Sequence, residues 1–105
     1  MINKEFEQQA VMLYKPTEKV VGLVRGIAEA IDGWKRSEIF FPFPIPLADG
    51  RDYDVFKVER TDDHAAFLVH WDGGGYASAY MLDEGRLERL EKAVKAYIKF
   101  LETSI

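Results

Sequence analysis

Cysteine is absent from the 105-residue chain. Its absence excludes disulfide bridges, thiolate nucleophiles and cysteine-ligated zinc or iron–sulfur centres, and it fits a reducing compartment. Long apolar runs are absent too, as is the basic and then apolar start that forms a signal peptide. We therefore expect a cytoplasmic protein with no membrane partner.

Basic residues are in deficit, with 14 Lys and Arg against 18 Asp and Glu and a formal net charge of −4. Sequence-independent binding to duplex DNA depends on many Lys and Arg contacts to phosphate, so duplex DNA is not an expected partner. The hydrophobic share of 48% with 30% charged residues is typical of a folded globular protein. The length predicts one domain, residues 1–105.

Proline is also scarce, but three of the four prolines alternate at Pro42, Pro44 and Pro46. In a strand, alternate residues direct their backbone N–H groups to the same edge, so the three missing N–H groups would leave that edge unable to pair. We therefore predict an edge strand over residues 40–47 whose outer edge is blocked by proline. A polyproline-like loop is the alternative.

Apolar periodicity predicts helices over residues 3–14, 18–34 and 84–103. The first segment could also be a strand. In the second, Gly22, Gly26 and Ala30 form a stripe of small residues that suits either close helix packing or a surface without a partner. Asp83 is a good N-cap for the last helix, whose apolar arc widens at Ala93 and Phe100 and could meet a second subunit.

Residues 53–60, 65–72 and 76–82 read as strands separated by turn signals. An antiparallel register with Val58 opposite Phe67, and Trp71 opposite Ala77, places the apolar side chains on one face. Extending the same pairing to the proline strand places Phe41 opposite Val58. The expected inner face then consists of Phe41, Phe43, Phe56, Val58, Phe67, Val69, Trp71 and Met81.

The predicted fold class is therefore α+β. We expect an N-terminal helical segment, a four-stranded antiparallel meander with a proline-blocked edge strand, and a long C-terminal helix packed on one sheet face.

The other sheet face carries the candidate binding residues, which are aromatic, polar or basic: Tyr53, Lys57, His70, Tyr76, Ser78 and Tyr80. Aromatic rings on an open sheet can stack bases, so one hypothesis is a single-stranded nucleic-acid-binding protein that uses the Tyr53, His70, Tyr76 and Tyr80 face. A four-stranded meander followed by a long helix is similar in outline to the single-strand-binding coactivator proteins. The alternative is a solvated face, or one covered by residues 1–14.

Three local patterns could suggest chemistry, and each has a simpler interpretation. The predicted register places His70 opposite Ser78, but Asp72 points away from His70 and a flat sheet offers no pocket, so we predict no catalytic residues. The run 62–64, Asp-Asp-His, is typical of a tight turn and does not predict a metal site. The glycine run 73–75 precedes a strand, which indicates a hairpin turn and not a phosphate loop.

These patterns predict a small non-enzymatic binding or adaptor protein without a cofactor. It would act through the outer sheet face or through the free edge of the last strand, with a protein partner or a second copy in a homodimer. Single-stranded nucleic acid is the alternative ligand. A third hypothesis is an acidic inhibitor or immunity-type protein whose carboxylates engage a basic partner.

Overall fold

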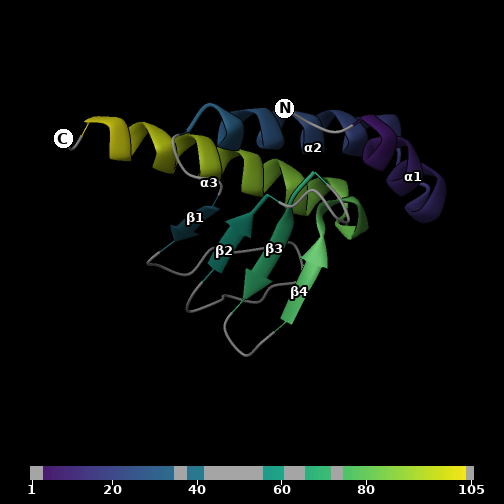
Figure 1. Cartoon of the computed structure of the whole chain (residues 1–105). Coiled ribbons are helices and arrows are strands. Elements are labelled where there is room, and N and C mark those ends of the chain that lie inside the picture. The colour runs from purple at the N-terminus through teal and green to yellow at the C-terminus, as the bar shows by residue number, and fades with distance from the viewer. Residues whose placement is uncertain (1–3, 35–37, 42–55, 61–65, 72–74, 104–105) are drawn as a thin grey trace.

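The computed structural model describes residues 4–34, 38–41, 56–60, 66–71 and 75–103. The fold is α+β, as predicted (Figure 1). The elements in chain order are α1 (Lys4–Tyr14), α2 (Glu18–Asp32), β1 (Glu38–Phe41), β2 (Phe56–Glu59), β3 (Leu68–Trp71), β4 (Gly75–Ser78), the short 3₁₀ helix η1 (Ala79–Met81) and α3 (Glu84–Thr103).

The four strands form one antiparallel sheet in the order β1-β2-β3-β4, so β1 and β4 are its two edges. The predicted meander is confirmed. Strand β1 ends at Phe41, and the alternating prolines that follow lie outside the described residues.

The observed register differs from the predicted one by two residues in every strand pair. Val58 pairs with Val69, Trp71 with Gly75, and Phe41 with Phe56. Side chains alternate between faces with a period of two, so a shift of two residues leaves each one on its predicted face. The alternation of apolar residues determines which face a side chain occupies, whereas the pairing register within that pattern depends on the lengths of the turns.

The predicted last strand over residues 76–82 is too long. Strand β4 ends at Ser78, and residues 79–81 turn into η1. The turn buries Tyr80, which is 3% exposed, and leaves Met81 exposed. Tyr80 therefore leaves the outer face and Met81 the inner face, because the alternation of a strand does not continue through a 3₁₀ helix.

Helices α2 and α3 lie side by side across one face of the sheet, and α1 lies at the β4 end of the molecule (Figure 1). Burying each large apolar side chain contributes roughly 1.5–3 kcal/mol before conformational entropy is subtracted. The largest fully buried side chains of the core are Phe41, Phe67, Ile27, Ile31, Leu87, Leu90, Val24, Val58, Val69 and Val94.

Polar contacts fasten the start of α2 to the start of α3. The Thr17 hydroxyl accepts the Val20 N–H (3.2 Å) as the N-cap of α2 and donates to Glu84 Oε1 (2.8 Å). Lys19 forms an ion pair with Glu88, and this contact raises the pKa of Lys19 and lowers the pKa of Glu88.

The predicted stripe of small residues makes a close contact at one position. A Cβ at Gly26 would lie 3.1 Å from Glu91 Oε2 on α3, whereas a Cβ at Gly22 would have nothing within 4 Å. The stripe is therefore not a continuous helix-packing seam.

Two phenylalanines on either side of Tyr97 provide a matched test of the core. The Tyr97 ring lies 5.2 Å from Phe41, which is 0% exposed, and 6.1 Å from Phe100, which is 60% exposed. Phe41→Ala should lower the free energy of unfolding by about 3–5 kcal/mol, because it empties a buried site. Phe100→Ala should change it by less than about 1 kcal/mol. Urea unfolding measures both, and equal losses would contradict this assignment of the core.

Candidate functional site

One row of side chains crosses the outer face of the sheet, with one member from each strand. The register aligns Phe40 with Lys57, Lys57 with His70, and His70 with Tyr76. Three of the six predicted site residues, Lys57, His70 and Tyr76, are therefore brought together. Phe40 was not predicted, although its alternation with the buried Phe41 was a signal that it faces outward.

Lys57 is held at the centre of this row by two carboxylates. Its Nζ lies 3.0 Å from Glu59 Oε2 and 3.2 Å from Glu38 Oε2, and it sits over the Phe40 ring, 5.3 Å from the centroid. The hydrogen bond to Glu59 raises the pKa of Lys57, partial burial opposes that effect, and the bond to Glu38 adds to it. The ammonium group is thus already neutralised within the sheet.

His70 and Tyr76 complete the row toward the β4 edge. They are a non-hydrogen-bonded cross-strand pair, which brings side chains closer together, and their ring centroids are 5.8 Å apart at 36°. His70 Nε2 lies 3.4 Å from Glu59 Oε2 without the geometry of a hydrogen bond. Tyr76 is 63% exposed, so it is the member of this pair that a partner could reach most readily.

The other predicted site residues do not join the row. Ser78 is 4% exposed, and among the described residues its hydroxyl has no hydrogen-bond partner. It pairs with Leu68, so the predicted juxtaposition of His70 and Ser78 is wrong. Tyr80 is buried in η1, and Tyr53 lies outside the described residues. This register provides no serine–histidine pair for nucleophilic chemistry.

Strand β4 presents its backbone to the outside of the sheet. The Ala79 N–H donates to the Phe67 carbonyl (3.2 Å), and hydrogen-bonded pairs alternate along an antiparallel ladder. The backbone N–H and C=O groups of Ala77 therefore face β3, whereas those of Tyr76 and Ser78 point to the opposite side. Ser78 is buried as a whole residue, so within β4 it is Tyr76 whose outward backbone groups could pair with another strand.

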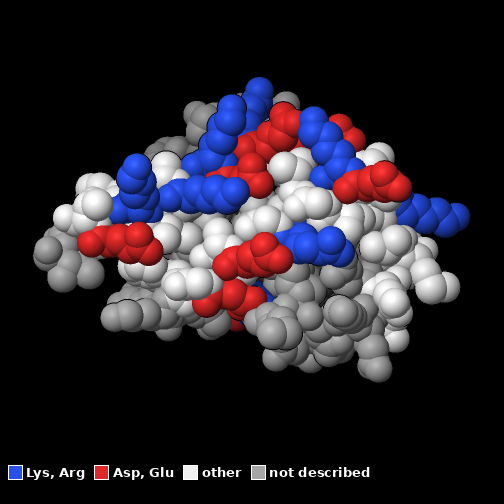
Figure 2. Space-filling view, turned by 90° about the horizontal axis from the view of Figure 1, so that it is seen from above, with Lys and Arg blue, Asp and Glu red and all other residues white. Residues whose placement is uncertain are grey.

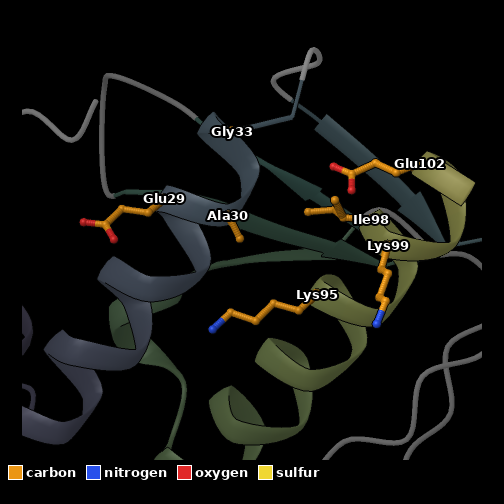
Figure 3. Close-up of a pocket in the computed structure, with 7 residues that line it drawn as sticks. All are labelled: Glu29, Ala30, Gly33, Lys95, Ile98, Lys99 and Glu102. Carbon is orange, nitrogen blue, oxygen red and sulfur yellow. The ribbon is translucent and has the colours of Figure 1, made fainter.

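A shallow open depression of about 440 Å³ lies between the C-terminal halves of α2 and α3 (Figure 3). Ala30 and Ile98 point into it, and its rim carries two carboxylates and two ammonium groups, from Glu29, Glu102, Lys95 and Lys99. Its lining contains no histidine, serine, threonine or tyrosine. We assign no chemistry to this depression, because its charges are mixed and it is open to solvent.

Charges of both signs are interspersed over the helical layer, and this face shows no broad field of a single sign (Figure 2). Among the described residues, no group of three or more His, Asp or Glu side chains could hold a metal ion. Asp62, Asp63 and His64, together with the first two glycines of the run 73–75, lie outside that part of the chain. None of the described helices is long and apolar enough to cross a membrane.

Comparisons with protein-family models, with curated proteins and with solved structures find no match to this chain. Any inference about function therefore depends on the outer-face row and the β4 edge.

The ion pairs of Lys57 with Glu38 and Glu59 predict how the free energy of unfolding changes at alkaline pH. The contacts with Glu59 and Glu38 raise the pKa of Lys57 in the folded protein. These contacts therefore stabilise the fold fully below the usual lysine pKa of about 10.4, and this contribution is lost as pH rises through the higher folded pKa. Lys57→Met should therefore lower the free energy of unfolding by up to about 1 kcal/mol near neutral pH, and the difference from wild type should shrink above about pH 10.4.

Urea unfolding of both proteins across this pH range measures the difference. Lys99→Met, which changes an exposed lysine on α3, is the matched control and should follow wild type throughout. If the difference in the free energy of unfolding between wild type and Lys57→Met did not vary with pH, the stabilising role of these ion pairs would be contradicted.

Proposed function

We propose that this protein binds a protein partner by accepting an extended segment along the edge of β4. The observation that carries the proposal is the outward backbone N–H and C=O groups of the exposed Tyr76 on an edge strand. Main-chain hydrogen bonds give affinity in strand addition, and side chains beside the new strand give specificity. Tyr76 would supply that specificity from the outer face.

The composition of β4 supports this role. Natural sheets protect their edges with charged side chains, prolines or bulges. Strand β4 consists of Gly75, Tyr76, Ala77 and Ser78, none of them charged or proline, and its pairing with β3 is regular. At the opposite edge, β1 carries Glu38, which is bonded to Lys57. The two edges differ, because β4 carries neither a charged residue nor a proline and its exposed residue Tyr76 precedes the buried Ser78.

The outer-face row gives less support to nucleic-acid binding. Lys57 is the only lysine or arginine in the row, and a histidine carries a charge only when it is protonated. A phosphate would therefore have to displace Glu38 and Glu59 from Lys57. Tyr80, one of the four rings proposed to stack bases, is buried.

Two substitutions at one position separate backbone recognition from side-chain recognition. Short peptides selected from a display library against wild type should bind Tyr76→Ala about tenfold more weakly, because the ring is lost. They should not bind Tyr76→Pro detectably, because the outward N–H is lost as well. Proline is tolerated at such edge positions, so the fold should persist, as circular dichroism can check.

Isothermal titration measures the affinities, and amide exchange locates the peptide through protection of the Tyr76 amide. If the peptides bound Tyr76→Pro as tightly as they bind wild type, the proposal would be contradicted.

A separate measurement distinguishes the nucleic-acid alternative. We expect no change in the fluorescence anisotropy of a labelled oligothymidylate at low or moderate salt. Micromolar binding that weakens with salt and disappears in Tyr76→Ala would replace the proposed function with single-strand recognition.

A further inference from the structure

We infer that Met81 is a site of oxidation by peroxides, and that its oxidation weakens binding at the β4 edge. The oxidation itself follows from the sulfur content of the chain and from the exposure of this side chain. Its effect on binding rests on the proposed function, because Met81 lies next to the strand that would receive the partner segment.

The chain offers a peroxide few sulfur atoms. It contains no cysteine and three methionines, Met1, Met12 and Met81. Cysteine thiolates are common targets of oxidation, and no thiolate is present here to compete with a thioether. Met1 lies outside the described residues, so the structure places two of the three sulfur atoms.

Both of these methionines are open to solvent. Met12 is 78% exposed on α1, and Met81 is 61% exposed on η1. Met81 stands between the buried residues Tyr80 and Leu82, and the Leu82 N–H donates to the Ala79 carbonyl (3.1 Å). The backbone of η1 is therefore fixed against the core while the Met81 side chain faces outward. A peroxide can reach this thioether without unfolding the protein.

Met81 also lies close to the part of the edge that the proposed function uses. Strand β4 ends at Ser78, and η1 follows it directly. Two residues of strand and three of 3₁₀ helix separate Tyr76 from Met81, so their Cα atoms lie at most about 13 Å apart. An extended segment of about four residues spans that distance. A segment bound at Tyr76 would therefore lie within reach of Met81.

Oxidation changes the chemical character of this side chain. The thioether sulfur attacks one oxygen of hydrogen peroxide, the S–O bond forms as the O–O bond breaks, and the displaced hydroxide takes up the proton of the transferred oxygen and leaves as water. Sulfur loses two electrons and the peroxide gains them. The product is a sulfoxide, which is polar where the thioether was apolar. Covering this oxygen with an apolar partner side chain would cost free energy, because its hydrogen bonds to water would be lost.

The same reaction leaves the core intact. The Met81 side chain is exposed, so its sulfoxide remains in water and no buried site is emptied or overfilled. Circular dichroism and the midpoint of urea unfolding should therefore be the same before and after oxidation. Binding at the edge is the property that we expect to change.

Peptide mapping tests the site. Cleavage after lysine and arginine places the three methionines in three different peptides, so mass spectrometry can follow each one separately during mild treatment with hydrogen peroxide. Met81 in the folded protein should react within about fivefold of its rate in the urea-unfolded chain, because its sulfur is accessible in both. Greater protection of Met81 would overturn the site.

Short peptides selected against wild type provide the binding measurement, with isothermal titration of each protein before oxidation and after the peroxide is removed. Wild type should lose at least about fivefold in affinity. Met12→Leu, which removes the other exposed thioether, should lose as much as wild type. Met81→Leu should have the same affinity before and after treatment, because leucine has no sulfur. A methionine sulfoxide reductase should restore binding to oxidised wild type.

Each contrary outcome has a defined meaning. If wild type bound the peptides equally well with Met81 reduced and oxidised, the inference would be overturned and the proposed function would stand. If Met12→Leu removed the sensitivity to peroxide and Met81→Leu did not, Met81 would be the wrong site. If no peptide bound wild type along β4, the proposed function would fail and the effect on binding with it, and the peptide map alone would decide whether Met81 is oxidised.

Discussion

The fold depends on the burial of one sheet face beneath two helices. Each strand has four residues, so each contributes at most two side chains to the inner face, and such a small sheet needs a packed partner layer to be stable. Helices α2 and α3 provide that layer, and Phe41, Val58 and Val69 are buried against it. The side chains that alternate with these buried residues along the strands therefore lie on the outer face.

Among the described elements, α1, α2 and α3 lie on the inner side or at the end of the sheet, so the described part of the outer face is formed by side chains of the strands themselves. Lys57 is held between Glu38 and Glu59, and His70 lies against Tyr76. These contacts pair the charges of the face with one another. They make the row a stabilising cross-strand network, and they leave few charged groups free to recognise a ligand.

The sequence contained enough information to predict the layers and the faces, but not the exact pairing. Helix 84–103 was predicted with its observed bounds, because Asp83 and the regular apolar spacing mark it clearly. The sheet register was displaced by two residues in each hairpin, since the alternation of Val58, Val69 and Ala77 is satisfied equally well by either pairing. The burial of Tyr80 was missed, because a 3₁₀ turn after a strand leaves no periodic signal in three residues.

The same two-residue displacement changes which side chains lie opposite each other on the outer face. With His70 opposite Ser78, the outer face would have held a potential nucleophile beside a base. With His70 opposite Tyr76, it holds an aromatic pair, and Ser78 is buried near the edge. In the proposed contact the groups that pair are the outward backbone groups of Tyr76, which would bind an extended chain whatever its side chains, so specificity would have to come from what lies beside the edge. Tyr76 is exposed beside the edge and Met81 is exposed on η1, so in the proposed contact these two side chains would supply the specificity.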